Sequence, residues 1–61
     1  MKILLDSEVK PEVEVLAINL ANQTVDFKDF DGICNAPYVA EGDLPTEYEL
    51  KAAIEKALGI G

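Results

Sequence analysis

The chain has 61 residues, with twelve carboxylates against five lysines and a formal net charge of −7, and it contains no His, no Arg, no Trp and a single cysteine, Cys34. Without His there is no imidazole base and no Ser-His or Cys-His pair, and one thiol cannot form a Cys-x-x-Cys motif or a tetrahedral zinc site. We therefore predict a protein that is not an enzyme and that holds no cofactor and no metal.

The size of the chain predicts one small acidic domain over residues 1–61. A domain this small buries only about 60% of the surface that its unfolded chain exposes. An internal disulfide cannot form with one cysteine, so we expect self-association into a homo-oligomer to supplement the core.

Charge and hydropathy limit the partners and the location. The negative balance and the lack of Arg argue against direct nucleic-acid binding, and no apolar run approaches the roughly 20 residues of a membrane span. The apolar start is too short for a signal-peptide core, and an unpaired cysteine suits a reducing compartment. We expect a soluble, intracellular (cytoplasmic) protein that binds another protein.

The first half of the chain predicts strands. Residues 3–5 are typical of a short buried strand, and residues 12–20 are rich in Val, Ile and Leu, which favours a strand. The same segment also has a helical stripe of apolar residues, with Pro11 suited to a first helical turn, so a helix remains the alternative there.

The middle of the chain predicts two further strands. Residues 24–30 alternate, with Val25 and Phe27 on one face and Asp26 and Lys28 on the other. Residues 21–23 would form the loop of a hairpin with the preceding segment. Residues 36–40 are expected to be a strand in which Pro37 requires an edge or a first position.

The last segment predicts a helix over residues 47–58. Thr46 and Glu49 have the spacing of a capping box, and Gly59 follows the last periodic residue. The core-facing stripe is apolar at helical spacing and consists of Leu50, Ala53, Ile54, Ala57 and Leu58. Together these elements indicate the α+β class: a small antiparallel sheet of three or four strands with a C-terminal helix packed on one face.

Two loop features have chemical interpretations. Asp29, Asp31 and Gly32 match part of a calcium loop, but Phe27 and Tyr38 stand where that loop needs carboxylates, which favours a solvated turn over a weak cation site. Cys34 lies in a predicted loop of turn-forming residues without a basic neighbour, which favours a small, half-buried apolar role over catalysis.

The helix also predicts an interface. Tyr48 faces away from the apolar stripe, beside Ala52 and Glu55, and tyrosine is enriched in interaction hot spots. Tyr38 is a further interface candidate, with a place in the core as its alternative.

Residues 36–38, continued through Gly42 to the helix, resemble the last strand pair and helix of thioredoxin-like domains. The resemblance covers less than half of the chain and includes no active-site cysteine pair, so it assigns no role to any residue.

Two functions are favoured as hypotheses, and a small enzyme is a third that would require two copies to bring carboxylates together in a shared cleft. The first is a non-enzymatic protein–protein interaction module, a self-associating accessory or structural subunit that docks through a sheet edge and the outer face of the helix. The second is an acidic nucleic-acid mimic that inhibits a DNA- or RNA-binding protein. Mimicry requires five carboxylates to line one stripe, namely Glu12, Glu14, Asp26, Asp29 and Asp31.

Overall fold

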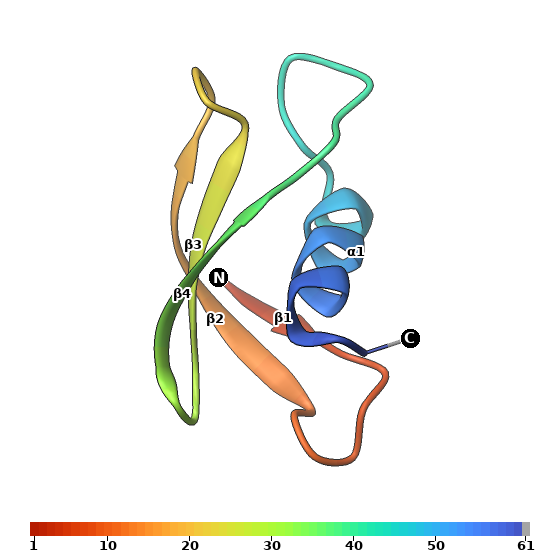
Figure 1. Cartoon of the computed structure of the whole chain (residues 1–61). Helices are drawn as coiled ribbons and strands as arrows, with labels where there is room; N and C mark the ends of the chain where they lie inside the picture. Colours follow the sequence, from red (N-terminus) through yellow and green to blue (C-terminus); the bar gives the residue numbers. More distant parts are fainter. Residues whose placement is uncertain (61) are drawn as a thin grey trace.

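The computed structural model describes residues 1–60 and contains one antiparallel sheet and one helix. The strands are β1 (Lys2–Leu4), β2 (Glu12–Asn19), β3 (Thr24–Asp29) and β4 (Gly32–Pro37), and the helix is α1 (Glu47–Leu58). The strands lie in the order β1-β2-β3-β4, and α1 lies over one face of the sheet (Figure 1). This arrangement confirms the predicted α+β class and the antiparallel sheet with a C-terminal helix.

The core lies between the sheet and α1 because alternate strand residues point toward the helix. In β3, Val25 and Phe27 are buried while Lys28 is exposed, as the alternation predicts. The buried apolar residues are Ile3, Leu5, Val13, Val15, Val25, Phe27, Ala36, Tyr38, Leu50 and Ile54. The opposite face of the sheet is not covered by any element within residues 1–60. It carries charged side chains from β1, β2 and β3 together with the exposed apolar side chains of Leu4 and Ile33.

The segment over residues 12–20 is a strand, as its β-branched content favoured, and not a helix. Val15 pairs with Phe27 and Ala17 pairs with Asp26, so Leu16 is an extra residue that forms a bulge. Before the bulge Val15 faces the helix, and after it Ile18 takes that face opposite Val25.

The fourth strand differs from the prediction. It begins at Gly32 rather than at residue 36 and ends at Pro37. Phe30 and Asp31 form a two-residue turn that sets Gly32 opposite Asp29, and the φ of 129° at Gly32 is accessible only to glycine. The predicted loop over residues 32–35 is therefore strand, because the hairpin continues the β3 ladder through residues that are individually turn formers.

The helix begins and ends where its capping signals place it. Thr46 Oγ1 accepts from the Glu49 backbone N–H at 3.1 Å, and Glu49 Oε1 accepts from the Thr46 N–H at 2.8 Å. Gly59 closes the helix with a φ of 76°.

Leu50 and Ile54 are both buried, and Ala53 and Leu58 are partly buried against the core, which confirms the predicted core-facing side of the helix. Ala57, predicted for the same stripe, is exposed instead, because it lies at the margin of that face.

Polar contacts hold α1 to the segment that follows β1. The Lys51 ammonium lies 2.9 Å from the Asp6 carboxylate, and the Asp6 backbone N–H donates to Glu55 Oε2 at 2.9 Å. The helix packs against β1 and β4, the two edge strands. Within residues 1–60, no helix is both long enough and apolar enough to cross a membrane.

Candidate binding groove

A groove of about 500 Å³ lies between α1 and the chain at the end of β4. The helix forms one wall, and the residues around Pro37 form the other. Most of the side chains that line the groove are apolar, and two are charged. The lining residues are Pro37, Val39, Tyr48, Glu49, Ala52, Ala53, Lys56 and Ala57. It is an open surface feature, and it lies on the side of the helix that faces edge strand β4.

The groove follows from the phase of the helix. Because Leu50 and Ile54 point into the core, Tyr48, Ala52 and Lys56, which are four residues apart, form a neighbouring row that stays accessible. The alanine at the middle of this row leaves the helix backbone open to close approach. Val39 and Tyr48 are 83% and 78% exposed, so the apolar rim of the groove is in contact with solvent.

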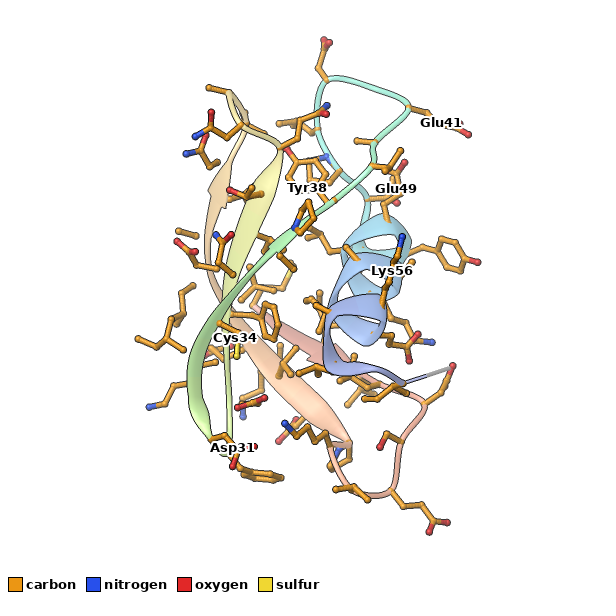
Figure 2. The ribbon with its side chains drawn as sticks, viewed as in Figure 1. Asp31, Cys34, Tyr38, Glu41, Glu49 and Lys56 are labelled. Atoms are coloured by element: carbon orange, nitrogen blue, oxygen red, sulfur yellow. The ribbon has the colours of Figure 1, made fainter. Side chains whose placement is uncertain are left out.

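The carboxylate in the groove is already used by the chain. Glu49 Oε1 accepts a hydrogen bond from the Thr46 N–H, and Glu49 Oε2 accepts a second one from the Glu41 backbone N–H at 3.0 Å. Glu41 and Glu49 are labelled in Figure 2. The hydrogen bond from the Thr46 N–H has the larger effect on the pKa of Glu49, and that from the Glu41 N–H adds to it. Both lower this pKa. Glu49 therefore stays ionised and holds the loop before the helix in place.

The positively charged side chain in the groove, that of Lys56, is not engaged by another residue of the described chain. Lys56 is exposed in the last turn of α1, and within residues 1–60 it forms no ion pair. This last turn is at the negative end of the helix dipole, where a positive charge is well placed. The groove thus offers an apolar floor, a tyrosine ring and one unpaired positive charge.

The four predicted interface residues are not together. Tyr48 and Ala52 both line the groove. Glu55 lies on another side of the helix, where it accepts the Asp6 N–H. Tyr38 is only 4% exposed and belongs to the core between β4 and α1, the alternative that the sequence left open for it (Figure 2).

Sequence reasoning missed Pro37 and Val39 as the second wall of the groove. A signal was present: Cys34, Ala36 and Tyr38 alternate with Asn35 and Pro37, which is the pattern of a strand with one buried face. Carried from residue 34 to residue 39, this alternation puts Tyr38 on the buried face and Val39 outside.

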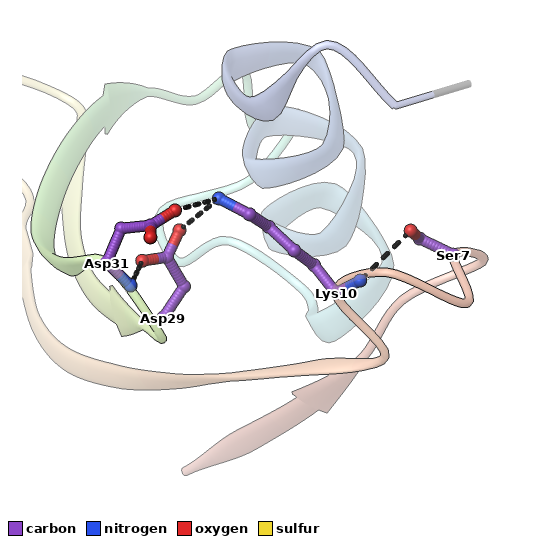
Figure 3. A network of polar contacts seen from close by, with 4 residues as sticks. All are labelled: Ser7, Lys10, Asp29 and Asp31. Atoms are coloured by element: carbon purple, nitrogen blue, oxygen red, sulfur yellow. Dashed lines mark hydrogen bonds and ion pairs between the residues drawn. The ribbon is translucent and has the colours of Figure 1, made fainter.

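The aspartates of the β3–β4 turn form an ion-pair network with Lys10. The Lys10 ammonium lies 2.9 Å from Asp29 Oδ2 and 3.0 Å from Asp31 Oδ2 (Figure 3). Asp29 Oδ1 also accepts the Asp31 N–H at 2.8 Å, and Ser7 Oγ accepts the Lys10 N–H at 3.1 Å. The ammonium occupies the position between the carboxylates that a cation would need.

This network shifts two protonation equilibria. The hydrogen bond from Lys10, followed by that from the Asp31 N–H, lowers the pKa of Asp29, whose side chain is almost fully buried. The hydrogen bonds to Asp29 and then to Asp31 raise the pKa of Lys10. Asp29 is thus a buried structural carboxylate and not part of a solvated turn, while Asp31 remains exposed.

The carboxylates named for nucleic-acid mimicry do not line one stripe. Glu12, Glu14 and Asp26 lie on the uncovered sheet face, and Lys28 pairs with Glu14 in the ladder there. Asp29 and Asp31 lie at the end of the β3–β4 hairpin and share Lys10. Positive charges therefore interrupt the acidic surface. In the described residues 1–60, no group of three or more His, Cys, Asp or Glu side chains is placed to hold a metal ion.

Comparison with known proteins finds no matching family model, no similar curated protein and no similar solved structure.

Proposed function

We propose that this chain is a non-enzymatic protein–protein interaction module, a self-associating accessory or structural subunit. The observation that carries the proposal is the apolar groove beside α1, with the exposed ring of Tyr48 at its rim.

The composition of the groove favours a protein surface over a small ligand. Small-molecule sites combine an apolar cavity with several convergent polar groups that fix the orientation of the ligand. Here Glu49 is occupied by two backbone N–H groups, which leaves Lys56 as the charged side chain able to bind a ligand. An apolar centre with tyrosine and a polar margin is typical of protein interfaces.

The size of the core supports self-association. Phe27 is the one phenylalanine buried in the core, and most of the other core side chains are Val, Leu, Ile or Ala. The single cysteine leaves the chain without an internal disulfide. A second copy on the groove would bury Val39 and Tyr48 and add apolar contact to a small core.

Sedimentation velocity and native mass spectrometry over a range of protein concentrations would test the proposal. We expect the wild-type chain to form a concentration-dependent oligomer. Ala52→Glu puts a charge on the groove floor and should abolish the oligomer, while the new carboxylate, four residues before Lys56, leaves the helix intact.

Val9→Glu is the matched control. It adds the same charge at a residue that is 79% exposed and lies outside the groove, so the oligomer should persist. A strictly monomeric wild-type chain, or equal loss of assembly in both variants, would contradict the proposal.

A further inference from the structure

Strand β4 has an open edge with unpaired backbone groups. The Tyr38 N–H donates to the Gln23 carbonyl at 3.0 Å, so Tyr38 directs its backbone groups toward β3. In an antiparallel ladder this direction alternates, and Ile33 and Asn35 therefore direct N–H and C=O away from the sheet. Because β4 is the last strand in the sheet order, these four groups have no strand beside them in the described part of the chain.

This edge lacks the charge that commonly protects edge strands. No charged residue occurs from position 32 to position 40, although 28% of the chain is charged. Edge strands are commonly blunted by charge, by proline or by short length. The other edge strand, β1, has three residues and carries Lys2, whereas β4 has six residues and its proline stands at its end.

The partner that fits an uncharged edge on this chain is a second copy. Two molecules that each carry a net charge of −7 repel one another over most of their surfaces. The neutral strip along β4 is the surface where two copies approach with the least repulsion. It is also self-complementary, since each outward residue offers one donor and one acceptor.

Building on the proposed self-association, we propose that two copies pair β4 with β4 in antiparallel orientation about a two-fold axis at Cys34, which joins their sheets into one. In this register Ile33 of one copy pairs with Asn35 of the other, and all the outward N–H and C=O groups of these residues are satisfied. A shift that sets Ile33 opposite Pro37 loses hydrogen bonds, because proline has no N–H.

The same axis brings the groove into the interface. Antiparallel strand pairing puts the two-fold axis perpendicular to the sheet, so both helices lie on the same face of the joined sheet. The groove lies between α1 and the end of β4 and thus faces the second copy. The two helices run antiparallel, which directs Lys56 toward the acidic first turn of the other helix, Glu47 and Glu49.

The size of the shared surface predicts a reversible dimer. Each copy contributes the edge of a six-residue strand and one side of a twelve-residue helix. Interfaces of stable complexes use about 20 to 30 residues on each side, which is more than the β4 edge and the groove provide together. The buried area therefore belongs to the range below about 1,200 Å² that is typical of weak complexes, and the dimer should dissociate on dilution.

The first test compares Asn35→Pro with Asn35→Ala by sedimentation velocity. Both variants lose the side-chain hydrogen bond from Asn35 to Asp26, at 2.6 Å, but only proline removes the outward N–H. An edge strand tolerates proline at a position where the backbone N–H of the replaced residue faces solvent. Circular dichroism would verify that both variants fold. We expect Asn35→Pro to raise the dimer dissociation constant about tenfold or more relative to Asn35→Ala.

The second test uses Cys34, the sole thiol, as a reporter of register. At the axis the two Cys34 residues form a non-hydrogen-bonded pair with Cα atoms about 4.5 Å apart, a distance compatible with a disulfide. Copper-phenanthroline with dioxygen would remove one proton and one electron from each thiol as the S–S bond forms. We expect rapid formation of a covalent dimer by the wild-type chain and slow formation by Asn35→Pro.

The outcomes separate this pairing from the proposed function. A wild-type dimer that Asn35→Pro does not weaken, or whose Cys34 thiols do not cross-link, overturns the β4 pairing and leaves self-association standing. A wild-type chain that is monomeric at every concentration overturns both and leaves the β4 edge to a strand of another protein.

Discussion

Ile54→Ala should remove much of the stability of the fold. The Ile54 side chain is fully buried, and with Leu50 it forms the contact of α1 with the sheet. Truncation of a buried isoleucine to alanine costs about 2 to 5 kcal/mol in free energy of unfolding, since it removes apolar contact and leaves a cavity. A domain of this length has a total of about 3 to 9 kcal/mol.

Thermal unfolding followed by circular dichroism measures this effect. At this size a loss of about 1 kcal/mol lowers the Tm by about 4 to 8 °C, so Ile54→Ala and Leu50→Ala should each lower it by about 8 °C or more. Tyr48→Ala is the control on the same helix, because its side chain is 78% exposed. The expected change for an exposed position is within about 0.5 kcal/mol, or about 4 °C.

The melts should be recorded at a concentration where the chain is monomeric, because assembly raises the Tm by mass action. If Tyr48→Ala lowers the Tm more than Ile54→Ala does, the side of α1 that faces the sheet has been assigned wrongly. The groove, whose floor depends on that assignment, would then be wrong as well.

Three further predictions concern caps and charges. Thr46→Ala removes the side-chain acceptor for the Glu49 N–H. It should cost about 1 kcal/mol in denaturant unfolding, whereas unchanged stability would show that the cap contributes nothing. Gly59→Ala places a side chain at a φ of 76°, although the added Cβ meets no atom within 4 Å. The left-handed conformation should make this variant less stable by about 1 to 2 kcal/mol in the same assay, and a neutral result would mean that the helix end relaxes. The folded-state pKa values of Asp29 and Glu49 are lowered, so the stability they contribute is present above their unfolded values and is lost as pH falls through about 4 and below. Melts recorded down to about pH 3 should show this loss, and Asp29→Asn should make it smaller, so an equally steep loss in that variant would exclude Asp29 as a contributor.

The elements that the sequence predicted well have their signals within a few residues. The capping box of Thr46 and Glu49 and the αL residue Gly59 define both ends of α1 locally. Val25 and Phe27 define the buried face of β3 by simple alternation. Such features do not depend on which other segment packs nearby.

The features that were missed depend on how one segment pairs with another. The start of β4 is set by its ladder with β3, which outweighs the turn preference of Asn35 and its neighbours. The burial of Asp29 depends on Lys10, 19 residues away, and no local pattern couples these two positions. The bulge at Leu16 likewise arises only from the pairing of two hairpin strands.

The attachment of α1 to the segment after β1 has a consequence for folding kinetics. Each strand of the sheet pairs with its neighbour in sequence, so the sheet closes only short loops. The hydrogen bond between Asp6 and Glu55 spans 49 residues, and its loop is closed late. We therefore expect the helix to dock after the main folding barrier and to detach first on unfolding. Weakening this attachment should accelerate unfolding while leaving the folding rate nearly unchanged.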